Sequence, residues 1–232
     1  MKTSIIFLSG LMLMACAGES GQTESESMAA SESTAQSAEE KKSKDGILEL
    51  GKSLPAADVK MKHIDGSEHS LRELAGEEGL LVIFSCNTCP FVVGNQKKSE
   101  GWEGRYPALF DHAEQSSIGM ALINSNEAKR DAGDGLEDMK ERYEQQGLKG
   151  AYLLDENHVV ADAFGALTTP HVFLFNKDME LVYKGAIDDS VDSPDEVKNP
   201  YVMNAMSALV AGQAIDPNST KQLGCSIKRV KA

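Results

Sequence analysis

Apolar positions along the chain follow two spacings, which together predict strands interleaved with helices. Runs composed mostly of apolar residues, typical of strands covered on both faces of a sheet, lie at residues 79–84, 120–123, 151–154, 171–175 and 181–184. Helical spacing and capping signals predict helices at residues 70–74, 136–146, 159–164 and 201–211. This order predicts an α/β domain with a mixed central sheet flanked by helices.

The first residues have a pattern that does not belong to a folded domain. Lys2 precedes an apolar run at residues 5–14, which is too short to span a bilayer as a mature helix. The run ends in "LMAC", residues 13–16, which resembles a bacterial lipoprotein box and implies cleavage before Cys16 and lipidation of that cysteine. The alternative is an ordinary signal peptide with an incidental cysteine. We therefore expect residues 1–15 to be removed and the mature protein to be exported, to a compartment where disulfides persist.

The next stretch is almost free of large apolar side chains. Residues 16–46 are dominated by Ser, Glu, Ala and Gln, so they cannot bury enough surface to offset their chain entropy. We expect them to form a disordered tether between a lipid at Cys16 and a folded domain at residues 47–232. Ala17 occupies the position of the Asp that resembles an inner-membrane retention signal, which favours an outer-membrane anchor facing the periplasm.

Charge and cysteine content narrow the function. The formal net charge of −13 argues against a nucleic-acid partner, since phosphate binding needs clustered Lys and Arg. The four cysteines are Cys16, Cys86, Cys89 and Cys225. The sequence has no second C-x-x-C pair and its five histidines are scattered, so a structural zinc site is not expected.

The Cys86-Asn87-Thr88-Cys89 motif directly follows a predicted buried strand and opens a predicted helix. A helix N-terminus presents unpaired N–H groups that stabilise a thiolate, and the spacing allows the second thiol to resolve a mixed disulfide. The motif therefore predicts redox chemistry without a prosthetic group. We expect Cys86 to lie nearer the exposed end of the turn and to attack, and Cys89 to lie deeper and to resolve.

Six segments make a family resemblance specific. They are "CNTCPFV" at 86–92, "ALINSNE" at 121–127, "YLLDE" at 152–156, "TPHVFLFN" at 169–176, "LVYKGAIDDS" at 181–190 and "GCSIK" at 224–228. With them the chain resembles the thioredoxin superfamily, within it the peroxiredoxin-like branch related to alkyl hydroperoxide reductase and thiol-specific antioxidant proteins. The resemblance implies a thioredoxin-like fold. Two positions depart from this resemblance: Thr88 stands where a His is usual, and Arg229 where an aromatic residue is usual.

The resemblance also implies roles outside the motif. Pro170 is expected to be a cis-proline lying against the disulfide, with Thr169 before it offering backbone hydrogen bonds to an extended substrate. Pro170 stands at the first position of a predicted strand, where proline is tolerated, and an ordinary trans proline is the alternative. Cys225 is either a small buried apolar residue or a third redox thiol near the pair.

Three functions remain open. The favoured one is a thiol–disulfide oxidoreductase that exchanges disulfides with partner proteins through Cys86 and Cys89 and is served by an electron-donor redox protein. The second is a thiol peroxidase with Cys89 as the peroxidatic residue. Peroxiredoxins hold this cysteine in a Thr-x-x-Cys turn, where Cys86 replaces the Thr, and use a later Arg, whereas residues 145–228 contain none. Both differences favour disulfide exchange.

The third function is a Cu(I) carrier. Two thiolates and an imidazole suit Cu(I), and the candidate ligands are Cys86, Cys89 and His171. Copper-delivery proteins of the same superfamily have three residues between the thiols, so the two residues found here argue against this function. We expect no resident metal.

Overall fold

The computed structural model describes residues 46–95 and 98–230. The predicted signal peptide, Cys16 and the predicted tether up to residue 45 lie outside the described residues. Among the residues described, no helix is both long enough and apolar enough to cross a bilayer.

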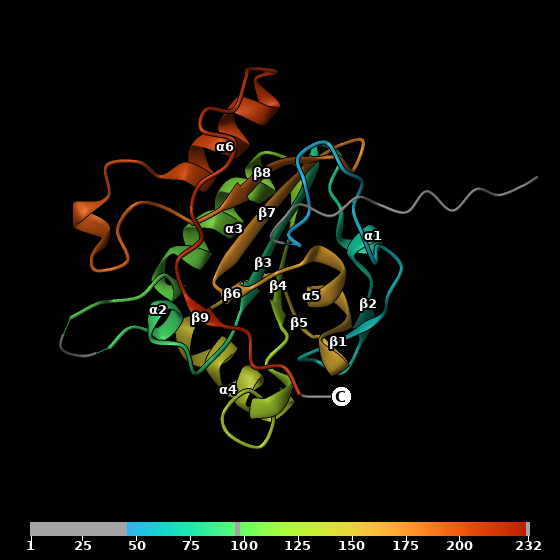
Figure 1. Ribbon diagram of the computed structural model, residues 1–232, viewed down its shortest axis with the longest axis vertical. Helices are drawn as coiled ribbons and strands as arrows, with labels where there is room; N and C mark the ends of the chain where they lie inside the picture. Colours follow the sequence, from blue (N-terminus) through green and yellow to red (C-terminus); the bar gives the residue numbers. More distant parts are fainter. Residues whose placement is uncertain (1–45, 96–97, 231–232) are drawn as a thin grey trace, which may run out of the picture. The chain divides into compact units, whose positions relative to one another are not determined.

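A seven-stranded mixed sheet runs through the domain in the order β2-β1-β5-β4-β3-β7-β8 (Figure 1). Its strands are β1 Met61–His63, β2 Glu68–His69, β3 Gly79–Ser85, β4 Ile118–Asn124, β5 Ala151–Leu154, β7 His171–Asn176 and β8 Leu181–Gly185. β3, β4 and β5 are parallel neighbours, whereas β7 pairs antiparallel with β3. All five apolar runs predicted as strands lie in this sheet, which confirms the predicted fold class.

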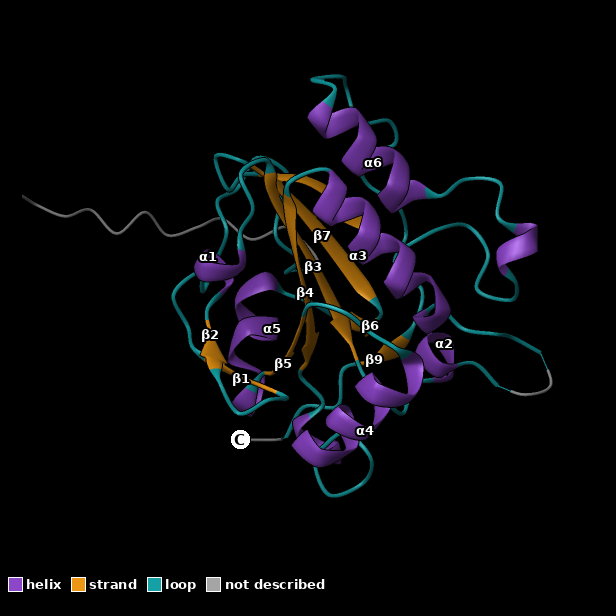
Figure 2. Ribbon diagram, turned by 180° about the vertical axis from the view of Figure 1, so that it is seen from behind, coloured by secondary structure: helices purple, strands orange, loops and turns teal. Residues whose placement is uncertain are grey.

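Helices cover both faces of the sheet. They are α1 Leu71–Leu74, α2 Pro90–Val93, α3 Tyr106–Gln115, α4 Leu136–Gln146, α5 Val159–Phe164 and α6 Tyr201–Val210, with short 3-10 turns at Glu103–Arg105, Glu127–Lys129, Glu156–His158 and Pro194–Glu196. α1 and α5 pack on one face, and α2, α3, α4 and α6 on the other, as the views from front and back show (Figures 1 and 2).

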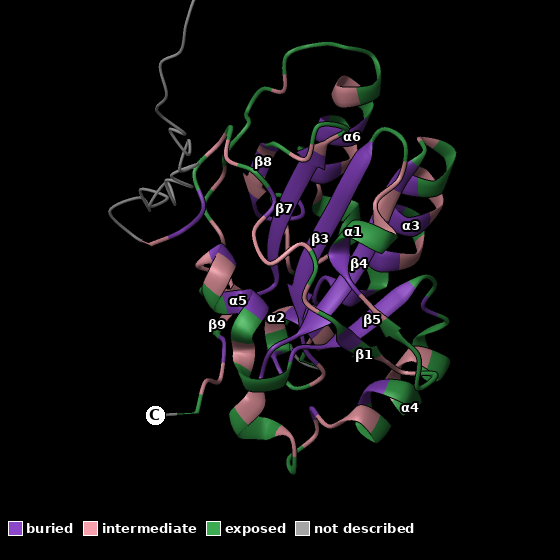
Figure 3. Ribbon diagram, turned by 90° about the vertical axis from the view of Figure 1, so that its right-hand side faces the viewer, coloured by how far each residue is buried: buried purple, intermediate pink, exposed green. Residues whose placement is uncertain are grey.

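Each face has its own core, because side chains of a strand alternate between the two sides of a sheet. The α5 face holds a group of aromatic rings packed edge to face, in which Phe164 lies 5.1 Å from Phe173 and 5.2 Å from Phe84 between ring centroids. The opposite core contains Trp102 and the active-site candidate Cys86. The central strands β3, β4 and β7 are buried along their length (Figure 3).

The helix that follows the cysteine motif is a single turn. It begins at Pro90, which suits the first helical position because its missing N–H would have no helical partner there. It ends at Gly94, whose φ of 77° is favourable only for glycine and where a Cβ would overlap the backbone of Glu100. Gly94 therefore terminates this helix.

A second, two-stranded sheet joins distant parts of the chain. β6, Thr168–Thr169, pairs antiparallel with β9, Cys225–Ser226, so that Thr169 lies opposite Cys225. Figure 1 shows β9 beside β6 near the start of α2. This pairing brings the third cysteine to the end of the sheet where the Cys86–Cys89 turn lies.

Candidate active site

The two cysteines of the motif lie where β3 ends and α2 begins. Cys89 is the N-cap of α2 and Cys86 is the first residue after β3. Their exposed fractions are 1% for Cys86 and 3% for Cys89. Sequence analysis predicted that Cys86 would be the more exposed of the two, and this is wrong, because β3 carries Cys86 directly out of the buried sheet.

A buried carboxylate holds the turn between the cysteines. Asp134 accepts hydrogen bonds from the backbone N–H of Asn87 at 2.7 Å and from the Thr88 hydroxyl at 2.7 Å. The side-chain amides of Asn124 and Asn126 donate to the same carboxylate at 2.9 and 3.0 Å. A carboxylate that accepts several hydrogen bonds from a turn restricts its conformations. Both spacer residues of the motif are therefore tied to one side chain.

The loop that carries Asp134 is itself anchored. Arg130 donates to the backbone oxygen of Asp134 at 2.8 Å and to the backbone oxygen of Asn124 at 2.9 Å. The "ALINSNE" segment was noticed in the sequence, but Asp134 lies beyond it and sequence reasoning missed it. The only signal was a lone Asp between two glycines, which is also typical of a turn.

Thr169 and Pro170 lie against both thiols. The Thr169–Pro170 peptide bond is cis, as predicted. The Cys86 sulfur is 3.1 Å from the Thr169 hydroxyl oxygen, and the Cys89 sulfur is 3.1 Å from the Thr169 carbonyl oxygen. The chain thus brings together four of the predicted site residues.

Thr169 does not offer a free strand edge in this structure. It is 1% exposed and its backbone is paired with Cys225 of β9. Gly224 makes this close approach feasible, because a Cβ at that position would overlap the Thr169 carbonyl oxygen. The strand edge that was expected to receive an extended substrate is therefore covered by β9 of the same chain.

Cys225 is the third member of a thiol cluster formed with Cys86 and Cys89. The thiol and the backbone N–H of Cys225 lie near enough to the Cys89 sulfur to lower the pKa of Cys89. It is partly exposed, whereas the other two thiols are buried. Of the two interpretations of Cys225 taken from the sequence, the structure favours the thiol near the pair.

The pKa of Cys89 is lowered to about 5. The largest cause is a hydrogen bond from the Cys86 thiol, and the thiol and N–H of Cys225 and the side chain of Thr169 add further hydrogen bonds to the sulfur. Hydrogen bonds donated to a charged form stabilise it, and here they outweigh burial, which raises the pKa. Cys89 is therefore the group that carries a thiolate at neutral pH.

The other two thiols keep their protons. The pKa of Cys86 is raised, first because its thiol donates to Cys89, then by burial and by the negative charge of Asp134. Burial and the neighbouring Cys89 raise the pKa of Cys225 to about 11. The expectation that the attacking thiolate would be Cys86 is not supported, because burial and Asp134 both disfavour its charged form.

His171 lies on the other side of the sheet from the thiols. It is paired in register with Phe84, and its ring centroid is 4.4 Å from that of Phe173 in the aromatic core. Burial is the main cause that lowers its pKa to about 3, so it is neutral. In the part of the chain that the structure describes, no three His, Cys, Asp or Glu side chains are grouped to hold a metal. The copper alternative therefore lacks its ligand set.

Comparisons with known proteins agree with this architecture. A protein from Geobacillus kaustophilus is 28% identical over 80% of this chain and 95% of its own, with a TM-score of 0.71. A hypothetical protein from Sinorhizobium meliloti is 27% identical over 80% of this chain and 97% of its own, with a TM-score of 0.70.

A more distant structure shares the fold alone. The bacterioferritin comigratory protein of Xanthomonas campestris is 15% identical over 71% of this chain and 99% of its own, with a TM-score of 0.50. No curated protein matches the sequence. The family model described as Redoxin matches residues 49–199, which include both cysteines of the motif and the cis-proline. The chain therefore belongs to the redoxin family of thioredoxin-like thiol oxidoreductases.

Proposed function

We propose that this redoxin is a thiol–disulfide oxidoreductase whose working couple is the Cys86–Cys89 dithiol and disulfide. The feature that supports this most directly is the proximity of the two thiols, which lowers the pKa of Cys89 and raises the pKa of Cys86, so that a thiolate stands beside a protonated thiol. A thiolate attacks a disulfide, and a second thiol in contact with it is placed to resolve the mixed disulfide.

The exchange moves two electrons from the protein to the substrate. The Cys89 thiolate attacks one sulfur of a substrate disulfide and forms a mixed disulfide, while the second substrate sulfur leaves as a thiolate. Cys86 loses its proton to that thiolate and attacks the Cys89 sulfur. This step forms the Cys86–Cys89 disulfide and releases the remaining substrate thiolate. An external dithiol protein then returns the pair to its reduced form.

A thiol peroxidase is the second candidate, and two features of the site favour it. Cys89 has a low pKa, and the Thr169 side chain donates to its sulfur, although the Thr of a Thr-x-x-Cys turn is replaced by Cys86. The Xanthomonas protein is described as having alkyl peroxide reduction activity. Against this function, the largest effects that lower the pKa of Cys89 are hydrogen bonds, and no Arg is among them.

Single-thiol variants test which cysteine attacks. Cys86→Ser/Cys225→Ser keeps only Cys89 in the domain, and the matched Cys89→Ser/Cys225→Ser keeps only Cys86. We expect the first protein to retain one glutathione when treated with oxidised glutathione at neutral pH, and the second to react far more slowly. The rate for Cys89 should fall as the pH drops, because the thiolate is then protonated. The midpoint should lie above that of the unaltered protein, in which the Cys86 and Cys225 thiols help lower the pKa of Cys89 to about 5. Faster reaction of Cys86 would restore the order expected from the sequence.

Two oxidants applied to the unaltered protein separate the candidate functions. Oxidised glutathione and hydrogen peroxide are each given to the reduced protein and to free glutathione at the same pH, and Cys86–Cys89 disulfide formation is followed by mass mapping. We expect the rate advantage over free glutathione to be larger with the disulfide. A larger advantage with peroxide would select the peroxidase instead, and failure of both oxidants to form this disulfide would reject the proposed couple.

We further infer that the domain works in the cell envelope, held by a lipid on Cys16 and facing the periplasm from the outer membrane. This proposal is supported by the "LMAC" box at residues 13–16 and by the polar composition of residues 16–46. Its partners there are protein thiols and disulfides, together with a redox protein that donates electrons.

A further inference from the structure

Access to the redox pair is restricted on the side of the cis-proline. Cys86 and Cys89 are 1% and 3% exposed, and the strand edge at Thr169 is covered by β9. Thiol exchange requires that the incoming sulfur approach the attacked sulfur in line, so a folded donor that approaches from the side of the cis-proline needs an accessible sulfur atom there. Within the thiol cluster only Cys225 is partly exposed.

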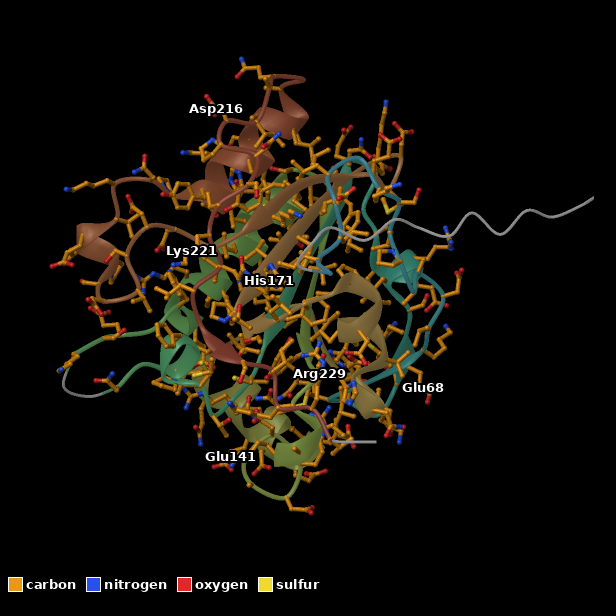
Figure 4. The ribbon with its side chains drawn as sticks, viewed as in Figure 1. Glu68, Glu141, His171, Asp216, Lys221 and Arg229 are labelled. Atoms are coloured by element: carbon orange, nitrogen blue, oxygen red, sulfur yellow. The ribbon has the colours of Figure 1, made fainter. Side chains whose placement is uncertain are left out.

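The segment that carries Cys225 is bound to the domain at several points. The backbone N–H of Ile227 donates to Leu167 at 3.0 Å, and that of Lys228 donates to the Asn126 side chain at 2.8 Å. Arg229, labelled in Figure 4, donates to the Asp162 carboxylate at 2.7 Å.

The chain before Cys225 is bound to the domain in the same way. The backbone N–H of Thr220 donates to the Lys184 carbonyl oxygen at 3.0 Å, and the Thr220 hydroxyl accepts from the backbone N–H of Ala186 at 2.9 Å. A strand fixed on both sides by side chains and backbone is a constant part of the site, and displacing it would break all of these hydrogen bonds. Cys225 is therefore a resident neighbour of Cys89 and not a segment waiting to be exchanged for substrate.

We propose that Cys225 is a third redox residue, the exchange port through which an external dithiol protein reduces the buried Cys86–Cys89 disulfide. The geometry that carries this inference is the position of Thr169, which pairs in register with Cys225 and lies 3.1 Å from the sulfurs of Cys86 and Cys89. The inference rests on the proposed function, because it concerns how that disulfide is regenerated.

The relay proceeds by two disulfide exchanges. Cys225 attacks the Cys89 sulfur of the Cys86–Cys89 disulfide, and Cys86 leaves and takes up the proton that Cys225 has lost. This step makes a Cys89–Cys225 disulfide without net oxidation. A thiolate of the external dithiol then attacks the Cys225 sulfur, and Cys89 leaves as a thiolate. The second thiol of the donor then attacks the donor's first sulfur in the mixed disulfide and releases Cys225 as a thiol. Two electrons have then entered the cluster.

The electrostatics of the cluster suit both steps. Burial raises the pKa of Cys225, and in the reduced protein the neighbouring Cys89 raises it further; only this second effect is absent once Cys89 is in a disulfide. Attack on the sulfur of the partly exposed Cys225 expels Cys89, the thiol of lowest pKa in the cluster, and a thiol of low pKa is the better leaving group.

Mass mapping of Cys86→Ser provides the first test. The full chain is reduced, treated with oxidised glutathione, quenched with acid and digested. We expect Cys225 to displace glutathione from Cys89, so the product should contain a Cys89–Cys225 disulfide and no retained glutathione. In Cys86→Ser/Cys225→Ser/Ser226→Cys the thiol is moved one position along β9, to the opposite face of the strand. That protein should retain glutathione on Cys89. Retention of glutathione by Cys86→Ser itself would overturn the relay.

Reduction kinetics provide the second test. The Cys86–Cys89 disulfide is prepared in the unaltered protein and in Cys225→Ser, and its reduction by dithiothreitol is followed at neutral pH. We expect Cys225→Ser to be slower by about tenfold or more, because the donor must then reach a buried sulfur. Equal rates would overturn the proposal. Failure of the unaltered protein to form the Cys86–Cys89 disulfide would instead reject the proposed function. Failure of the relay can therefore be distinguished from failure of the proposed function.

Discussion

Asp134 shows how one buried side chain sets the chemistry of a distant motif. It lies 47 positions from Asn87, yet its carboxylate receives the Asn87 backbone N–H and the Thr88 hydroxyl. Its negative charge also raises the pKa of Cys86. Thr88, which departs from the residue usual in the family, uses its hydroxyl in this contact. Asn87 and Thr88, the two residues between the cysteines, thus hold the carboxylate that raises the pKa of Cys86.

Asp134→Asn should make the redox couple more oxidising. Removing the negative charge lowers the pKa of Cys86, and stabilising a thiolate stabilises the reduced protein relative to the disulfide. A change of one pKa unit corresponds to about tenfold in the equilibrium with glutathione. The disulfide fraction is measured across glutathione buffers, together with the pH profile of Cys86 alkylation.

The exposed Asp131→Asn is the matched control for charge. It should leave both the redox equilibrium and the pH profile unchanged. A purely structural role for Asp134 would lower stability without moving the pH profile of Cys86, and that result would contradict the electrostatic explanation.

The predictable part of the active site is the part encoded by neighbouring residues. The spacing of Cys86 and Cys89 and the Pro at the start of a helix are local, so the dithiol could be predicted. The thiolate position could not, because donors to Cys89 come from Thr169 and Cys225, which only the tertiary fold brings near. Local reasoning from the helix terminus selected Cys86 for this reason, whereas the pKa shifts of the two thiols favour Cys89.

The short strands β6 and β9 control access to the thiols, although they contribute little to the hydrophobic core. β9 is only two residues long, and its place depends on the close approach of Gly224 to β6. No periodicity can mark a strand of that length, and its pairing with β6 is long-range. By contrast, β5 and α5 were predicted with their observed bounds, because their apolar residues repeat within a few positions.

The sequence analysis did not predict α3, although, unlike β9, this helix has a periodic signal. Its buried residues Tyr106, Leu109, Phe110 and Ala113 follow helical spacing, so the signal was present. Asp111 and His112 separate Phe110 from Ala113, and Pro107 stands near the start, where proline is typical of a first helical turn. The helix was therefore available to sequence analysis, unlike β9.

Gly224→Ala should loosen β9 without disturbing the main sheet. The added Cβ would overlap the Thr169 carbonyl oxygen, so the strand must move away from β6. We expect a loss of about 1–3 kcal/mol in the free energy of unfolding, as for other overpacked sites, and faster alkylation of Cys225. Denaturant unfolding and timed alkylation measure the two effects.

Gly104→Ala is the matched glycine control, since a Cβ there would meet no atom within 4 Å. It should leave the alkylation of Cys225 at the rate of the unaltered protein. Unchanged alkylation in Gly224→Ala as well would show that the approach of β9 to β6 does not limit access to this thiol.

Taken as one chain, the protein joins a redox domain to an N-terminal stretch of different composition. The fold class was predictable throughout, because strands buried on both faces leave long apolar runs. The proposed lipid anchor is a separate question, since Cys16 lies outside the described residues. Its basis is the order of a positive residue, an apolar run and a small residue before cysteine.

Cys16→Ser should release the protein from the membrane fraction and abolish its labelling by a fatty-acid probe, because the acceptor thiol is lost. Fractionation and labelling in a bacterial host measure both effects. Ser20→Ala, four positions further along, should remain anchored and labelled. A membrane fraction unchanged by Cys16→Ser would contradict the lipoprotein box and leave an ordinary signal peptide as the explanation.

The pairing of β9 with β6 has a consequence for the order in which the protein matures. During synthesis Cys86 and Cys89 emerge more than a hundred residues before Cys225. Until β9 docks, the early thiols lack the cover over Thr169 and two of the hydrogen bonds that stabilise the Cys89 thiolate. A nascent chain therefore carries a dithiol that is more open and less acidic than the finished one. Its reactivity reaches the final value only when the late segment folds, so completion of the chain acts as the last step in assembling the redox centre.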